Sequence, residues 1–370
     1  MTPSSPAHFR AAASLARASA RAPCAIARAK PGRIHPCIAF DHLGRRRVEV
    51  RYESHGGLGP VRRSPGSISV RPVPAPTVVL GGISAGRHLS PAAFDPSPGW
   101  WPGLVGSGGV LDPARRPLIG VDYLGGAGRP RHPLRPVTTR DQARALAAVL
   151  DHLGTGAVSL VGASYGGMVA LAFAQLFPAR VDRLVVVCAA HRTHPMATAV
   201  RSVQRAAVSL GADAGDPARG LALARALAMT TYRSAREFEE RFSPLAISAA
   251  ATGARPFAGP ARFPVEDYLE ARGAAFAHSF DPERFVALSE SIDLHRTRPA
   301  DLPAHALLIS FDSDVLVPPW LMEELAARGG RPPARHVTIR SPYGHDAFLK
   351  EAEAVSGCLR AELGGEGVVR

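Results

Sequence analysis

The sequence predicts an α/β protein with a mostly parallel, doubly wound sheet and an inserted helical cap. In the first half of the 370-residue chain, short apolar segments alternate with amphipathic ones. This alternation is typical of parallel strands that are covered by helices on both faces. From about residue 191 to residue 298 the strand-like segments stop and helical spacing takes over, before the alternation returns. We therefore expect one sheet with one helical insertion.

Six short apolar segments are the expected strands of the sheet. They cover residues 77–80, 117–122, 157–161, 184–187, 306–310 and 336–339. Residues 37–40 and 48–52 flank the polar turn DHLGRRR, and this pattern predicts an antiparallel hairpin at the sheet edge. The segment SPGSISVRPVPAP at 64–76 is expected to be a loop.

Helical spacing indicates helices between these strands and throughout the cap. The core helices are expected at 139–153, 166–177 and 319–327, with a last helix after Asp346. The cap helices are expected at 197–210, 220–232, 235–242, 265–277 and 282–294. The chain then divides into a disordered extension (1–35), a first core segment (36–190), the cap (191–298) and a second core segment (299–370).

The positive charge is concentrated near the N-terminus. Of the net charge of +13, residues 1–72 supply +10, because thirteen Lys and Arg there face only Asp41, Glu49 and Glu53. The rest of the chain carries only +3, too little to predict a basic groove across the body. We therefore expect a small-molecule substrate and no nucleic-acid partner.

Cysteine spacing and hydropathy exclude further classes. The four cysteines lie far apart without a CxxC pair: Cys24, Cys37, Cys188 and Cys358. Neither a disulfide scaffold nor a zinc site is therefore predicted, and a reducing cytoplasm is the expected compartment. Apolar runs stay below about 18 residues, so no membrane association is expected. Residues 1–35 are rich in Arg, Ala and Ser without an acidic residue. Transit peptides share this composition, but we interpret the segment as a disordered extension.

A strand-to-helix turn around Ser164 carries the strongest chemical signal. The buried segment AVSLV leads into Gly162-Ala-Ser164-Tyr-Gly166, and a helix is expected to follow. In such a nucleophile elbow, small flanking residues permit a strained turn that exposes the serine hydroxyl at a helix N-terminus. The pattern predicts that Ser164 is a catalytic nucleophile.

A serine hydroxyl needs a base, and the base needs an orienting carboxylate. In the α/β-hydrolase fold these residues follow the serine in the order acid, then histidine, at the carboxyl ends of later strands. Asp314 follows the strand ALLIS, and His345 lies between the final strand and the last helix. Asp312 is the alternative acid, whereas other downstream histidines lack this position. We therefore predict an α/β-hydrolase fold with the catalytic residues Ser164, Asp314 and His345.

Two backbone N–H groups are required to stabilise the oxyanion that forms when the serine attacks. The N–H of Tyr165, directly after the nucleophile, is the first candidate. The second is expected in Gly81-Gly-Ile83-Ser-Ala, after the strand TVVL, where glycine lets the backbone approach closely. We assign this second role to Ile83.

Further segments of the chain match one enzyme family in the same order. They are VEVRYES (48–54), GWWPGLVG (99–106) with LDP (111–113), VDYLGG (121–126), GGM (166–168), LALAR (221–225), TYRS (231–234), VEDYL (265–269), DVLVP (314–318) and SPYGHDAFL (341–349). From residue 48 to 351 the chain thus resembles the homoserine O-acyltransferases of methionine biosynthesis, which have the α/β-hydrolase fold. The resemblance implies acyl-CoA as co-substrate, no further cofactor and a homodimer joined through the cap.

The resemblance also implies an acceptor site. In that family an arginine, a tyrosine seven residues later and the aspartate after the catalytic histidine hold the amino acid, and they match Arg225, Tyr232 and Asp346. Their chemistry suits the task, because a guanidinium forks onto an α-carboxylate and a carboxylate receives an α-ammonium. Arg205 matches another family arginine on the first cap helix, with a solvated helix charge as the alternative interpretation.

The acyl donor follows from two departures from the acetyl-transferring members. Those usually carry GGSMGG at the elbow and HALTG at the first oxyanion segment, whereas this chain has GASYGG (162–167) and GGISA (81–85). The variant resembles a subgroup that transfers succinyl, whose carboxylate requires a cation such as Arg87, Arg192 or Arg205. We favour homoserine O-succinyltransferase, with acetyl as donor, L-serine as acceptor and a carboxylester hydrolase as the alternatives.

Overall fold

The computed structural model describes residues 29–58, 75–126, 135–245, 262–303, 305–329 and 333–364. Residues 1–28, Cys24 among them, lie outside this part of the chain, as does most of the loop expected at 64–76. None of the described helices is both long enough and apolar enough to cross a membrane.

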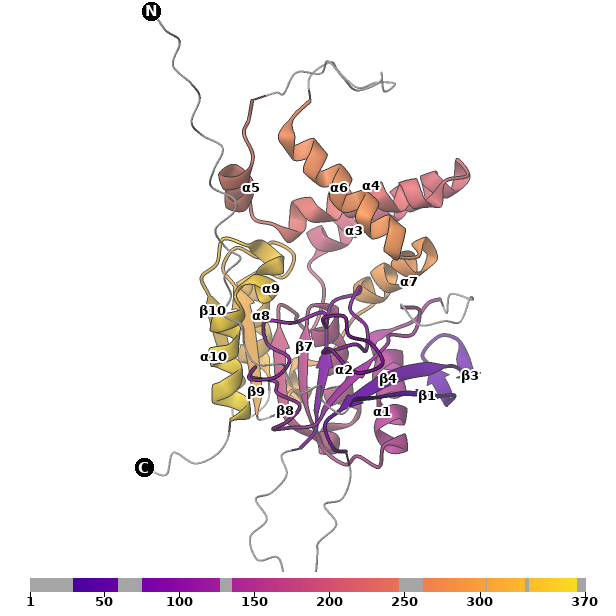
Figure 1. The fold of residues 1–370 in the computed structure, drawn as a ribbon, viewed down its shortest axis with the longest axis vertical. Coiled ribbons are helices and arrows are strands. Elements are labelled where there is room, and N and C mark those ends of the chain that lie inside the picture. The colour runs from indigo at the N-terminus through magenta and orange to yellow at the C-terminus, as the bar shows by residue number, and fades with distance from the viewer. Residues whose placement is uncertain are drawn as a thin grey trace, which may run out of the picture.

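One eight-stranded sheet forms the centre of the molecule (Figure 1). Its order is β1-β4-β6-β5-β7-β8-β9-β10, in which β1, β4 and β6 pair antiparallel and the remaining pairs are parallel. The strands are β1 (Ala29–Ile34), β4 (Val50–His55), β5 (Thr77–Leu80), β6 (Leu118–Val121), β7 (Val158–Ala163), β8 (Val181–Val187), β9 (Ala306–Phe311) and β10 (Arg335–Ile339). The predicted α/β-hydrolase fold with a mostly parallel sheet is confirmed, and all six predicted strands are present.

The N-terminal part of the fold differs from the prediction in two respects. Residues 29–34, expected within the disordered extension, form the edge strand β1 against β4. The expected hairpin partners also differ, because β2 (Cys37–Phe40) pairs with β3 (Gly44–Arg47) in a separate two-stranded sheet, while β4 joins the main sheet. The side chains of β3 are all exposed, so its sequence GRRR has the polarity of a turn and conceals the strand.

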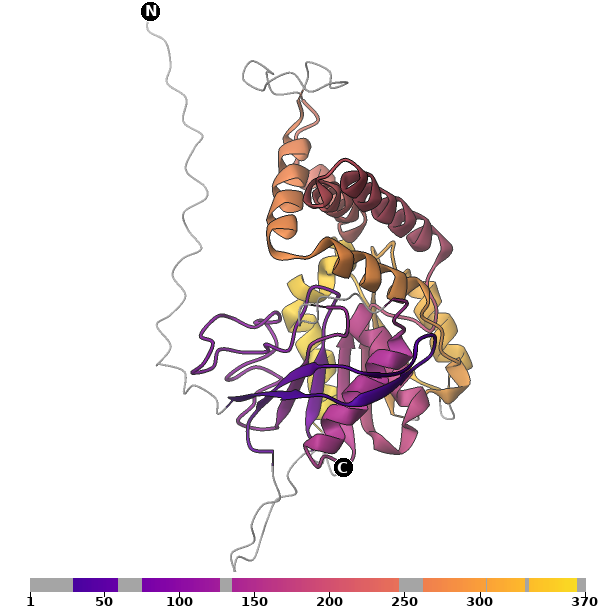
Figure 2. The ribbon, with the colours of Figure 1, turned by 90° about the vertical axis from the view of Figure 1, so that its right-hand side faces the viewer.

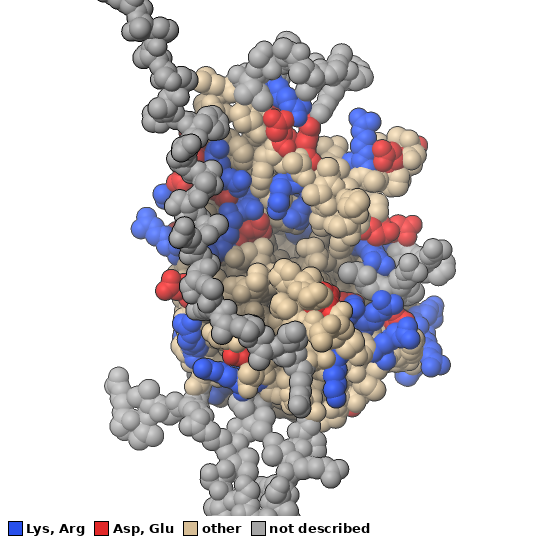
Figure 3. Space-filling model, in the orientation of Figure 1, with Lys and Arg blue, Asp and Glu red and all other residues tan. Residues whose placement is uncertain are grey.

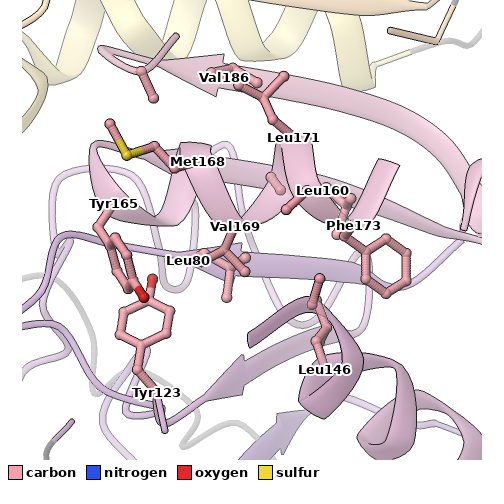
Figure 4. Packing of buried hydrophobic residues seen from close by; sticks show 14 of the residues in the cluster. Leu80, Tyr123, Leu146, Leu160, Tyr165, Met168, Val169, Leu171, Phe173 and Val186 are labelled. Atoms are coloured by element: carbon pink, nitrogen blue, oxygen red, sulfur yellow. The ribbon is translucent and has the colours of Figure 1, made fainter. Parts of the chain in front are cut away.

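Side chains of the central strands alternate between two apolar layers. Val78 and Leu80 of β5 point to one face, and Val79 points to the other. The first face is covered by α1 (Thr139–His152), α2 (Tyr165–Leu176) and α8 (Pro319–Arg328); Figure 4 shows part of this layer. The second face is covered by α10 (Ala352–Leu363) and by the loop that carries Trp101. This two-sided burial explains why the strands are apolar throughout.

A capping box explains where α1 begins. The Thr138 side chain accepts a hydrogen bond from the Asp141 N–H (3.2 Å), and the Asp141 carboxylate accepts one from the Thr138 N–H (2.8 Å), so the two residues form a capping box at the start of α1. The expected last helix is divided in two, because α9 (Ala347–Lys350) ends before α10 begins.

A helical insert between β8 and β9 lies over one end of the sheet (Figures 1 and 2). It contains α3 (Pro195–Asp213), α4 (Pro217–Tyr232), α5 (Ala235–Arg241), α6 (Pro264–Ser279) and α7 (Pro282–Asp293). The two ends of the insert meet in an antiparallel bridge between Arg192 and Arg296, next to a hydrogen bond from the Thr297 N–H to the His191 carbonyl (2.9 Å). On the face in Figure 3, Lys and Arg lie among Asp and Glu over both the core and the insert.

Candidate active site

Ser164 lies in the tight turn between β7 and α2. Its backbone has a positive φ of 54°, which is uncommon for a residue with a side chain. A Cβ at Gly162 would collide with the backbone of Gly166, and a Cβ at Gly166 would collide with the Leu80 carbonyl. Only glycine fits at these two positions, so the Gly-x-Ser-x-Gly pattern is a steric requirement of the turn.

The structure brings the three predicted catalytic side chains into one hydrogen-bonded line. Ser164 Oγ lies 2.8 Å from His345 Nε2, and His345 Nδ1 lies 2.7 Å from Asp314 Oδ2. Asp314 and His345 are both buried. These distances are those of a nucleophile, a general base and an orienting acid.

Backbone groups fix the Asp314 carboxylate. Its Oδ1 accepts hydrogen bonds from the N–H groups of Leu316 and Val317, both at 2.9 Å, which leaves Oδ2 for His345. The alternative acid, Asp312, is exposed and accepts a hydrogen bond from the Ser341 N–H at 2.9 Å. Its position thus stabilises the loop before His345, while Asp314 contacts the imidazole.

Two opposing effects act on the pKa of His345. Burial lowers it, but the charge of Asp314 and the hydrogen bond to Asp314 raise it, and the charge of Asp346 adds to the increase. The net effect is a raised pKa. A raised pKa makes the neutral imidazole a stronger base toward the serine hydroxyl.

The two N–H groups expected to stabilise an oxyanion, those of Tyr165 and Ile83, come from separate segments of the chain. Tyr165 begins α2, and Ile83 follows β5; both residues line the pocket that contains Ser164. Neither N–H has a hydrogen-bond partner among the residues that the structure describes. Both N–H groups are therefore free to donate a hydrogen bond, and their role at an oxyanion stays a prediction.

A network of tyrosines anchors the loop that carries Ile83, and sequence reasoning missed it. The Tyr123 hydroxyl donates to the Gly81 carbonyl (2.6 Å), which also accepts from the Gly166 N–H (2.9 Å). The ring of Tyr123 packs edge-on against Tyr165 (Figure 4), whose hydroxyl lies 2.7 Å from Ser291 Oγ on α7. This network connects the two oxyanion loops to each other and to the insert.

A pocket of about 680 Å³, partly open to solvent, lies between the core and the insert. The core contributes Ser164, Ile83 and His345, and the insert contributes Arg201 and Tyr232. The nucleophile therefore faces a chamber whose opposite wall is formed by the insert.

Of the four expected acceptor residues, Tyr232 is among the described residues that line this pocket, and Arg225, Asp346 and Arg205 are not. Tyr232 lines it, with its ring centroid 6.0 Å from that of His345, and the Arg225 guanidinium packs on the Tyr232 ring at 5.0 Å. Asp346 forms an ion pair with Arg233 at 3.3 Å. Arg205 bonds to Ser289 (2.9 Å) and Asp293 (2.7 Å) and is not among the residues that line the pocket.

The three arginines considered as partners of a succinyl carboxylate also lie in different parts of the structure. Arg87 pairs with Asp122 (2.6 Å) and Glu53 (3.3 Å) on the core. Arg192 lines the pocket, together with Arg201, which the sequence analysis did not single out. Arg201 lies one helical turn before Arg205, and this spacing on α3 is the signal that identifies it as a second candidate.

Comparison with known proteins agrees with this geometry. The family model described as alpha/beta hydrolase fold matches residues 82–352, so the chain belongs to the α/β-hydrolase superfamily. A homoserine O-acetyltransferase structure from Bacillus anthracis superposes with a TM-score of 0.76 at 18% identity, covering 92% of this chain and 98% of the other. Esterase E22 gives 0.75 at 19%, covering 90% and 100%. At these identities the likeness shows the fold alone.

Sequence relatives define the family more closely. The homoserine O-succinyltransferase of Xanthomonas campestris pv. campestris is 41% identical, covering 88% of this chain and 82% of the relative. The Thermus thermophilus homoserine O-acetyltransferase is 35% identical (85% and 86%), and the Stenotrophomonas maltophilia serine O-succinyltransferase is 32% identical (77% and 86%). The chain is an acyl-CoA-dependent acyltransferase of the homoserine O-acyltransferase family.

Replacing Asp314 by Asn is expected to lower kcat by about three to four orders of magnitude, because the imidazole loses its orienting carboxylate. Loss of the negative charge also lowers the pKa of His345. Activity requires the neutral imidazole, so the acidic limb of the kcat/KM profile moves to lower pH. Asp312→Asn is the matched control, for which we expect less than about threefold change in kcat and no shift in the acidic limb of the kcat/KM profile. A large loss in Asp312→Asn with an active Asp314→Asn would contradict this assignment.

Tyr123→Phe is expected to lower kcat about tenfold, since the carbonyl of Gly81 loses one hydrogen bond and the loop of Ile83 loosens. The KM for the acyl donor changes little, because the pocket walls remain. Tyr52→Phe, at a buried tyrosine on β4, is the control. Steady-state kinetics of both variants test the idea, and equal effects on kcat would refute it.

Proposed function

We propose that this protein is a homoserine O-succinyltransferase that acts in methionine biosynthesis. It transfers succinyl from succinyl-CoA to L-homoserine through an acyl-serine intermediate at Ser164. The observation that carries the proposal is the composition of the pocket, in which Ser164 and His345 of the core face arginines of the insert. The 41% identity to a homoserine O-succinyltransferase supports the same reaction.

In the first half-reaction His345 Nε2 takes the proton of Ser164 as Oγ attacks the thioester carbonyl. The N–H groups of Tyr165 and Ile83 stabilise the negative oxygen of the tetrahedral intermediate. The intermediate then collapses with cleavage of the carbon–sulfur bond, and the imidazolium returns its proton to the CoA sulfur. Free CoA leaves, and the succinyl ester of Ser164 remains.

In the second half-reaction homoserine occupies the space that CoA has left. Its hydroxyl gives a proton to His345 as the oxygen attacks the ester carbonyl, and the imidazolium then protonates Ser164 as the product departs. Tyr232 lines the pocket and the Arg225 guanidinium packs on its ring, and the two side chains together suit an α-carboxylate. Asp346 follows His345 directly and suits the α-ammonium, in exchange for part of its ion pair with Arg233.

Besides contributing residues that bind the acceptor, the insert is proposed to exclude water. A serine ester next to an activated imidazole hydrolyses when water reaches it, and hydrolysis would waste the thioester. The helices of the insert close one side of the pocket, with Thr231 and Tyr232 at the end of α4. The insert thus covers one side of the acyl-serine, as a transferase requires.

A cytoplasmic homodimer is the remaining part of the proposal. Large apolar side chains are exposed on the insert, and a partner insert would cover them: Met196, Val203 and Leu210 on α3, and Leu223 on α4. An interface through the insert would place this apolar surface between two copies of the chain.

The proposed reaction is tested by CoA release from purified protein. Succinyl-CoA and acetyl-CoA are each combined with L-homoserine, L-serine or no acceptor. We expect homoserine-dependent release with succinyl-CoA to exceed every other combination, and Ser164→Ala to reduce it by about five to six orders of magnitude or to background. A preference for acetyl-CoA or for serine would name the corresponding acetyltransferase or serine enzyme, and acceptor-independent release would indicate a hydrolase.

A further inference from the structure

Two arginines line the pocket that contains Ser164. Arg192 lies at the start of the insert, before α3, and Arg201 lies on α3. A succinyl thioester differs from an acetyl thioester by an added CH2–COO⁻ group, which carries a negative charge. Bringing that carboxylate into a partly buried pocket costs free energy unless a cation pairs with it. The two arginines are therefore the candidates for this contact, and their surroundings distinguish them.

Arg201 belongs to a charge cluster that is one negative charge short. Its Nε and Nη2 both contact Asp293 Oδ1, at 2.8 and 2.6 Å, while Arg205 Nη1 contacts Asp293 Oδ2 at 2.7 Å. Two guanidinium groups thus share one carboxylate at the end of α7, which leaves a net charge of +1. The Arg201 side chain is only 12% exposed, so water screens this charge weakly.

The geometry leaves part of the Arg201 guanidinium free to bind. No partner of its Nη1 is found in the part of the chain that the structure describes, and the residue lines the pocket. Asp293 holds the opposite edge of the guanidinium, which fixes its plane. A fixed guanidinium edge is well suited to a carboxylate.

Arg201 also lies close enough to act on the catalytic base. Burial lowers the pKa of His345 and Asp314 raises it, and the charge of Arg201 is a further, smaller influence that lowers it. A carboxylate bound at Arg201 would offset this cationic charge. The acyl group would then strengthen the base that its own transfer requires.

The Arg192 side chain contacts residues of α8. Its Nη2 contacts Glu324 at 2.6 Å, its guanidinium packs 5.8 Å from the ring of Trp320, and its side chain is 30% exposed. Trp320 is itself exposed on α8. Arg192 thus contributes to the rim of the pocket, where solvent screens its charge.

We propose that Arg201 binds the free carboxylate of the acyl group and thereby selects a succinyl over an acetyl donor. Arg205 and Asp293 position Arg201 and do not themselves contact the acyl group. This inference rests on the proposed function, because it requires that the donor be a dicarboxylic acid monothioester.

The test measures acylation alone, as CoA release in a single turnover without acceptor. We expect Arg201→Gln to slow acylation by succinyl-CoA at least about 30-fold, since a charged hydrogen bond is lost. Acylation by acetyl-CoA changes less than about threefold. Arg201→Lys recovers part of the loss by keeping the charge without the fork. Arg192→Gln is the comparison variant, and we expect it to change the succinyl-to-acetyl ratio of the acylation rates far less than Arg201→Gln does.

Three outcomes would overturn the inference. An unchanged succinyl-to-acetyl ratio in Arg201→Gln would assign Arg201 a structural role, and a larger change of that ratio in Arg192→Gln would transfer the contact to Arg192. A raised KM for homoserine with normal acylation would place the acceptor's carboxylate at Arg201. If the wild-type protein is not acylated by succinyl-CoA at all, the proposed function fails, independently of any variant.

Discussion

The hydrogen-bonded line from Asp314 through His345 to Ser164 is the interaction on which the rest of the site depends. It joins three loops that follow β7, β9 and β10, strands that lie near one another at one side of the sheet. Parallel order brings the carboxyl ends of these strands to the same edge. The buried charge of Asp314 is tolerated because two backbone N–H groups and the imidazole satisfy its oxygens. Loss of the Asp314 contact would remove both the partner that fixes the tautomer of His345 and the effect that raises its pKa.

The same line imposes steric constraints on its surroundings. Ser164 reaches His345 only from a strained turn, and that turn requires glycine at 162 and 166. The carbonyl of Gly81 accepts hydrogen bonds from Gly166 and Tyr123, so the elbow and the Ile83 loop are held as one unit. Contact between Tyr165 and Ser291 extends this unit to the insert. The catalytic line and the wall opposite it are thus positioned together.

Local sequence signals predicted the parts of the site that depend on local structure. The elbow is a steric pattern, and the loop of Asp314 follows β9, which is apolar because both its faces are buried. The loop of His345 follows the edge strand β10, which is only partly buried. The edge strand β1 escaped prediction, since AKPGRI contains proline and charge and lacks a regular apolar alternation. Arg201 escaped as well. Its spacing from Arg205 places both arginines on one face of α3, but the local sequence does not show the contact that both make to Asp293, which lies 92 and 88 residues away.

The central claim is that Ser164 carries the acyl group between donor and acceptor. Intact-mass and peptide mass spectrometry of the protein after mixing with succinyl-CoA, without acceptor, test it most directly. We predict an increase by one succinyl group on the peptide that contains Ser164, lost on addition of L-homoserine and absent in Ser164→Ala. Homoserine-dependent turnover without any such adduct under rapid quenching, or an adduct on another residue, would contradict the account.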